Sequence, residues 1–150
     1  MALLIGFVAG LRTLTAPAAV SLAARLGWLQ LGNTPLAFLG ATAVPWVFGV
    51  LAIGELINDK LPKTPSRKAP AAFAARVASG ALCGAAIGAA SDSLAAGLAA
   101  GVVGAVLGTL GGYEARRSLV KATGGRDLPV ALLEDAVAVL TALAVVGAFR

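Results

Sequence analysis

Long apolar runs alternate with short polar stretches along the whole chain. The apolar segments lie at residues 2–29, 34–58, 69–91, 93–113 and 128–149. Each segment is close to the ~20 residues that an α-helix needs to cross ~30 Å of hydrocarbon. The pattern therefore predicts an all-α, polytopic membrane helix bundle of about five transmembrane segments, formed by residues 1–150 as a single domain.

The first segment admits two interpretations. Arg12 interrupts its apolar run and precedes a Pro-Ala-Ala sequence, as Arg67 does later in the chain. One straight helix over 1–29 is the first expectation, and five crossings then put the two termini on opposite sides of the membrane. The alternative is a pair of half-helices around a break at Thr13–Ala16, so that the segment is broken or re-entrant.

An internal repeat appears when the chain is shifted by 59 residues, which overlays 41–89 on 100–148 without a gap. The informative matches are Gly49 with Gly108, Glu55 with Glu114, Arg67 with Arg126, and Pro70 with Pro129. Each unit is two helices joined by a basic loop. The repeat therefore predicts a duplicated two-helix unit whose copies have the same orientation and are related by an axis along the membrane normal.

Composition supports the membrane interpretation. The sequence is 59% hydrophobic and 13% charged, whereas soluble domains carry roughly 25% charged residues. Most cations lie in two loops between apolar runs, which indicates cytoplasmic loops under the positive-inside rule rather than a nucleic-acid partner. We expect a bacterial inner-membrane location, with lipid head groups bound by Lys60, Lys63, Arg67, Lys68, Arg116, Arg117, Lys121 and Arg126.

The residue inventory excludes much of enzyme chemistry. The chain has no His and one Cys, Cys83, which removes imidazole metal sites, disulfides and His-based catalytic triads. Carboxylates, Ser21, Ser79 and Tyr113 remain, at spacings that suggest no catalytic group. We therefore expect no enzyme activity, no metal and no cofactor.

Glycines recur at helical spacing in the third and fourth segments, including Gly80, Gly84 and Gly88, then Gly97 and Gly101. Ridges of small residues let helix backbones approach closely in lipid. Tight packing within one chain and a subunit interface both explain such ridges. A bundle of five helices has little interior, so we also expect a homo-oligomer.

Several ionisable residues lie inside apolar segments, where each charge costs about 2.5–3.5 kcal/mol on insertion scales. Those expected to form an intramembrane polar site are Arg12, Arg76, Glu134 and Asp135. Arg76 and Asp135 are equivalent under the repeat, which predicts an ion pair between them. Glu134 points about 100° away around the same helix, so Arg12 is its expected partner.

A second polar group is expected at the cytoplasmic ends of the second and fourth segments. It comprises Glu55, Asn58, Asp59, Tyr113 and Glu114. A carboxylate at a helix C-terminus opposes the helix dipole, so its presence needs a further reason. Salt bridges to the following basic loops are one explanation, and a proton or cation site at the mouth of a central path is the other.

Several motifs resemble a known family. The strings GELINDKLPKTPSRKAP, AARVASGALCGAA, GYEARRSLVKATGG and VALLEDAVAVL are similar to the bacterial membrane-protein family catalogued as domain of unknown function 4126, in its short form. The likeness covers nearly the whole chain and implies a polytopic inner-membrane protein. It implies no activity, because the family has no assigned catalytic residues, but its motifs include the charged positions Glu55, Asp59, Lys60, Arg76, Glu134 and Asp135.

Two functions are compatible with these features. The first is a small transporter, channel or flippase-like protein whose intramembrane charges line a polar path. The second is a structural or lipid-binding membrane protein whose buried charges are ion pairs that fix the helix register. The sequence indicates no substrate for either.

Overall fold

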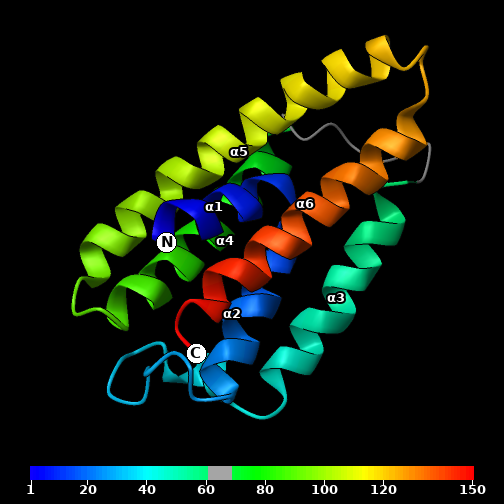
Figure 1. Ribbon diagram of the computed structural model, residues 1–150. Coiled ribbons are helices and arrows are strands. Elements are labelled where there is room, and N and C mark those ends of the chain that lie inside the picture. The colour runs from blue at the N-terminus through cyan, green and yellow to red at the C-terminus, as the bar shows by residue number, and fades with distance from the viewer. Residues whose placement is uncertain (61–68) are drawn as a thin grey trace.

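The computed structural model describes residues 1–60 and 69–150, and the described part of the chain is helical (Figure 1). Its α-helices pack side by side in one bundle. The elements are α1 (Ala2–Leu11), α2 (Thr15–Arg25), the short 3-10 helix η1 (Ala37–Gly40), α3 (Val44–Asn58), α4 (Pro70–Ala89), α5 (Leu94–Ala122) and α6 (Asp127–Gly147). This confirms the all-α prediction.

Three of these helices, α4, α5 and α6, are long and apolar enough to cross a bilayer. They match the third, fourth and fifth apolar segments of the sequence. The second segment yields a shorter helix than expected, because α3 begins only at Val44 with Pro45 in its first turn. Proline is well tolerated there, where its missing N–H has no helical partner to lose.

The first apolar segment is broken into two half-helices, as in the alternative interpretation. At ~1.5 Å per residue, α1 and α2 are each only about 15 Å long and are separated at residues 12–14. α1 runs parallel to α5, since Gly6 lies against Gly101 and Gly10 lies against Gly108. α2 then returns alongside α3, so residues 1–25 form a helical hairpin.

The hairpin corrects the expectation that the termini lie on opposite sides. Met1 and Phe149 line the same surface hollow as Ser91, and the Arg150 guanidinium lies 5.8 Å from the centre of the Trp28 ring. Both termini are therefore at one end of the bundle, here called the terminal end. The opposite end, which carries Lys121 and Arg126, is called the basic end (Figure 1).

The glycine ridges pack inside the chain. A Cβ atom added to Gly84 or Gly97 would lie less than 3.0 Å from backbone atoms of the facing helix, and one added to Gly101 would meet both Gly80 and Gly84. α5 thus lies against α4 and α1 at backbone contact distance, which van der Waals packing in lipid favours. Packing within one chain accounts for this ridge.

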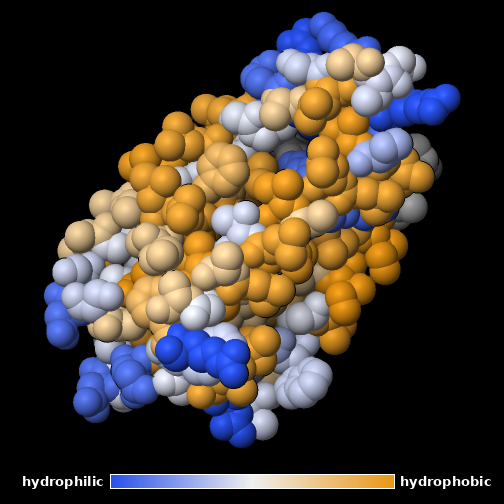
Figure 2. Space-filling model, in the orientation of Figure 1, coloured by the Kyte–Doolittle hydropathy of each residue, from blue (hydrophilic) through white to orange (hydrophobic). Residues whose placement is uncertain are grey.

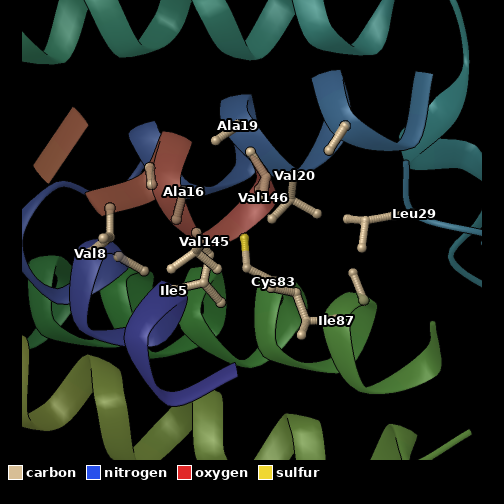
Figure 3. Close-up of a cluster of buried hydrophobic side chains, with 14 of the residues drawn as sticks. Ile5, Val8, Ala16, Ala19, Val20, Leu29, Cys83, Ile87, Val145 and Val146 are labelled. Atoms are coloured by element: carbon tan, nitrogen blue, oxygen red, sulfur yellow. The ribbon is translucent and has the colours of Figure 1, made fainter. Parts of the chain in front are cut away.

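A buried apolar cluster joins the hairpin to α4 and α6. Figure 3 shows Ile5 and Val8 of α1, Val20 of α2, Cys83 of α4 and Val146 of α6 pointing toward one another. α3 contributes no buried residue to this cluster, although Val44 and Phe48 pack against it, and of the residues of α3 only Ala52 is buried. The face in Figure 2 is hydrophobic across its middle and hydrophilic toward its corners, the distribution expected of a helix bundle in lipid.

Candidate functional site

The turn of the α1–α2 hairpin is held by an arginine from α4. Arg76 Nη1 donates hydrogen bonds to the carbonyl oxygens of Gly10 at 2.8 Å and Leu11 at 2.7 Å. The last carbonyls of a helix have no partner within it and carry the negative end of its dipole. A guanidinium at this position therefore satisfies buried acceptors that lipid cannot satisfy.

A carboxylate from α3 holds the other side of the same turn. The two Glu55 oxygens each accept a hydrogen bond at 2.8 Å, one from the backbone N–H of Thr13 and one from that of Leu14. These groups lie at the N-terminus of α2, where the dipole favours a negative charge. Ser79 of α4 also donates to the Thr13 carbonyl. Both helix ends inside the bundle are thus stabilised by a charge of the appropriate sign.

Arg12 lies in the break itself and is completely buried. Its Nη1 atom lies 2.5 Å from Asp59 Oδ2, and its Nη2 atom lies 2.5 Å from Asp135 Oδ1. Glu134 Oε2 is farther away, 3.9 Å from Nη2. The hairpin therefore carries one cation into a group of three carboxylates from α6 and the end of α3.

Two more cations complete this group. Lys60 Nζ lies 2.6 Å from Asp135 Oδ2, while Arg116 Nη1 lies 2.8 Å from Asp59 and 3.5 Å from Glu134. Among the described residues, these contacts join three positive and three negative side chains, and Arg116 also contacts Asp127. We call these six residues the ion cluster: Arg12, Asp59, Lys60, Arg116, Glu134 and Asp135.

The contacts of Arg12 are ion pairs rather than well-directed hydrogen bonds. Its three guanidinium nitrogens are buried, and none has an aligned hydrogen-bond acceptor among the described residues. The same holds for Asp135 Oδ1. Directed and bidentate bonds are what make an Arg–carboxylate pair strong. Charge therefore holds Arg12 in place, and its Nε–H has no hydrogen-bond acceptor among the described residues.

The ion pairs differ in part from those predicted. The expected Arg76–Asp135 pair is wrong, because Asp135 binds Arg12 and Lys60 while Arg76 binds the end of α1. The α1–α2 hairpin supplies partners for both residues. The Arg12–Glu134 contact is present at 3.9 Å.

The residues predicted at a cytoplasmic mouth separate in the structure. Glu55 and Asp59 face the hairpin, as described above. Glu114 is exposed and lies 3.8 Å from Arg117 on the same helix. Asn58 is exposed at the end of α3, and Tyr113 is half-buried on α5.

The predicted lipid-contact residues also divide into groups. Lys60 and Arg116 make ion pairs within the ion cluster, and their contact with lipid head groups stays a prediction. Arg117, Lys121 and Arg126 are exposed at the basic end. Lys63, Arg67 and Lys68 lie outside the described residues.

A hollow between α5 and α6 reaches the ion cluster from the side of the bundle. It has a volume of about 200 Å³, and Arg116 and Glu134 are among its otherwise largely apolar lining residues. Figure 2 shows this hollow in the hydrophobic face, with hydrophilic atoms visible inside it. The ion cluster is thus close to the surface on one flank, although Arg12 itself is covered.

Sequence reasoning missed two features of this site. Backbone groups at the hairpin turn, from Gly10 to Leu14, form hydrogen bonds with Arg76 and Glu55. A residue pattern does not indicate which backbone atoms become hydrogen-bond partners. Asp127 was also missed, and it binds Arg116 at 2.7 Å. Its position in the first turn of α6, eleven residues beyond Arg116, gave a weak signal for this pairing.

Comparison with known proteins finds one family model, described as a domain of unknown function (DUF4126), which matches residues 1–148. No curated protein and no solved structure matches the chain.

Proposed function

Because the chain belongs to the DUF4126 family, whose name records no activity, its function has to be inferred from the site, and we propose a small membrane transporter, channel or flippase-like protein. In this proposal the polar path passes through the ion cluster. The hairpin turn supplies Arg12 to that path, and α3, α5 and α6 supply the other charges.

One observation carries the proposal: a hairpin enters the bundle only part-way and places Arg12 among three carboxylates. Ionisable groups inside membrane segments are costly and commonly mark ion or substrate paths. Discontinuous helices whose ends meet inside the bundle are a recurrent way to build transporter sites. A bundle that needed only stability would be served equally well by apolar packing at these positions.

The chemistry of Arg12 supports the same proposal. Its buried N–H groups lack aligned acceptors among the described residues. An anion or a water molecule that enters from the hollow beside Glu134 would therefore gain hydrogen bonds that the carboxylates do not make. Asp135 lies between Arg12 and Lys60 and contacts both, so this carboxylate helps to hold Arg12 beside the proposed path.

The proposed topology is four crossings, by α3 to α6, plus the hairpin as a re-entrant element. The strongly basic end then faces the cytoplasm of a bacterial cell and the terminal end faces outward, as the positive-inside rule favours. α3 is only about 22 Å long at ~1.5 Å per residue, so the bilayer thins beside it or η1 extends the crossing.

The helix boundaries support the proposed duplication. Shifting α3 (44–58) and α4 (70–89) by 59 residues gives 103–117 and 129–148, which fall within α5 and almost wholly within α6. The first helix of each unit runs toward the basic end and the second returns. We further propose that the protein is a homo-oligomer in lipid, which its mass in detergent tests.

A second function is favoured by the completeness of the pairing. Each carboxylate of the ion cluster lies within 4.0 Å of at least one cation. Such balance also suits a structural or lipid-binding protein in which the charges only fix the helix register.

The two functions separate in flux measurements on reconstituted vesicles. The vesicles are loaded with a pH-sensitive dye, or with a set of labelled monovalent cations and anions. The decisive variant is Arg12→Met/Asp135→Leu, which removes one charge of each sign. The matched control is Glu114→Gln on the exposed surface.

Transport predicts a flux above that of protein-free vesicles for the wild type and Glu114→Gln, and its loss in the double variant. The double variant should still fold, because it replaces both members of a buried ion pair by apolar side chains and leaves no new charge imbalance. No flux for the wild type, with a folded double variant, would count against transport of these ions and favour the structural or lipid-binding function.

A further inference from the structure

A large apolar groove lies between α2, α3 and α6, well away from the ion cluster's Arg116 flank. Its volume is about 860 Å³, within the range of roughly 300–1,000 Å³ that is usual for ligand sites, and its walls include Leu22, Trp46, Ile53 and Leu143. The groove exists because α3 packs mainly against α2 and leaves a gap toward α6. It opens sideways, toward the hydrocarbon of the proposed bilayer.

One end of the groove carries a cation and a tryptophan. Arg25 lines the groove near the terminal end, is exposed, and makes no ion pair or hydrogen bond with any described residue. Trp46 lines the same end and is 76% exposed. Tryptophan and arginine at this level are typical of the boundary between hydrocarbon and head groups.

The length of the groove matches one leaflet. Its lining on α3 runs from Pro45 to Leu56, which is about 16 Å at ~1.5 Å per residue. Half of a ~30 Å hydrocarbon core is about 15 Å. An acyl chain with its head group beside Arg25 would thus extend to the far end of the groove near Thr15 without entering the other leaflet.

We propose that this groove binds one anionic phospholipid from the leaflet at the terminal end, with an acyl chain between α3 and α6 and the phosphate on Arg25. The apolar walls, the single unpaired cation at the mouth and the one-leaflet length all favour this occupant. The groove shares no lining residue with the ion cluster, so the proposal stands whether or not the protein transports a solute.

Two glycines on α3 provide a matched pair of variants. A Cβ atom at Gly49 or at Gly54 meets nothing within 4 Å, so larger side chains fit at both positions. Gly49 lines the groove, whereas Gly54 is not among its lining residues. Gly49→Leu therefore places a bulky side chain inside the groove, and Gly54→Leu makes the same change elsewhere on the same helix.

The experiment is native mass spectrometry of the delipidated protein in detergent, titrated with phosphatidylglycerol or with phosphatidylcholine. The wild type, Gly54→Leu and Lys121→Gln should each retain one phosphatidylglycerol molecule in preference to phosphatidylcholine. Arg25→Gln should retain it roughly tenfold less, because a charge-assisted bond to phosphate is lost. Gly49→Leu should lose it, while its circular dichroism spectrum remains that of the wild type.

Equal retention by Gly49→Leu and Gly54→Leu would overturn the proposal, since the lipid would then lie outside the groove. Equal retention by Arg25→Gln and the wild type would overturn the assignment of the phosphate to Arg25, and equal retention of the two lipids would overturn the preference for an anionic lipid. A dimer without bound lipid, present in the wild type and lost in Gly49→Leu, would show that a second copy of the chain fills the groove instead.

Discussion

Arg12 Nη2 and Asp135 Oδ1 lie 2.5 Å apart. Arg12 is in the turn of the α1–α2 hairpin, and Asp135 is on α6. Both side chains are almost fully removed from solvent. Asp135 also accepts a hydrogen bond from Lys60 at 2.6 Å, so this one carboxylate ties the hairpin, the end of α3 and α6 together. The pair therefore links the stability of the hairpin to the charge balance of the ion cluster.

Neutralising Asp135 should destabilise the protein strongly. Asp135→Asn removes the carboxylate that lies against both Arg12 and Lys60. An uncompensated buried charge costs about 3–5 kcal/mol. Thermal unfolding in detergent, followed by circular dichroism, measures the loss. Glu114→Gln removes an exposed carboxylate from the same protein and should change the free energy of unfolding by no more than about 0.5 kcal/mol. Similar losses for the two variants would contradict the assigned role of Asp135.

Removing the Arg76 side chain's charge should loosen the hairpin. Arg76→Met leaves the carbonyls of Gly10 and Leu11 without their buried donor, at a cost of about 2 kcal/mol or more. Hydrogen exchange should become faster in α1 before it does in α5. Arg117→Met makes the same change at an exposed position and should leave exchange in α1 unaltered. Unchanged protection of α1 in Arg76→Met would show that the arginine does not hold the turn.

Glycine substitutions on α5 should have opposite effects on the two sides of the helix. A Cβ at Gly101 would overlap the backbone of α4, whereas a Cβ at Gly111 meets nothing within 4 Å. Gly101→Ala should therefore lower the melting temperature in detergent. Gly111→Ala should keep or raise the melting temperature, because alanine favours a helix by up to about 1 kcal/mol relative to glycine. A harmless Gly101→Ala would contradict the close backbone contact.

The sequence was sufficient to predict the long helices, because an apolar run of about 20 residues has few other outcomes. It also located the buried charges, since an arginine or carboxylate inside such a run is conspicuous. The glycine ridges predicted close packing of helices, because small residues at helical spacing are also easily recognised in a sequence. These signals are local, and they depend on spacing alone.

The partners of the buried charges could not be predicted in the same way. Repeat equivalence suggested that Arg76 faces Asp135, but the α1–α2 hairpin has no counterpart of equal length in the repeat. It inserts Arg12 beside Asp135 and the end of α1 beside Arg76. Residue spacing does not reveal where an extra element enters a bundle, and backbone carbonyls compete as partners without any sequence signal.

The hairpin makes a topological prediction that one labelling experiment can test. Cys83 is buried and is the only cysteine, so a Cys83→Ala background allows single cysteines to be placed at will. Ala2→Cys and Gln30→Cys lie at the two ends of the hairpin, and Lys121→Cys lies at the basic end. In intact cells a membrane-impermeant maleimide should label positions 2 and 30 from outside, and should label position 121 only after permeabilisation.

A straight helix over 1–29 would place positions 2 and 30 on opposite faces, so labelling of only one of them in intact cells would rule out the re-entrant hairpin. Labelling of position 121 alone from outside would keep the hairpin and reverse the proposed orientation.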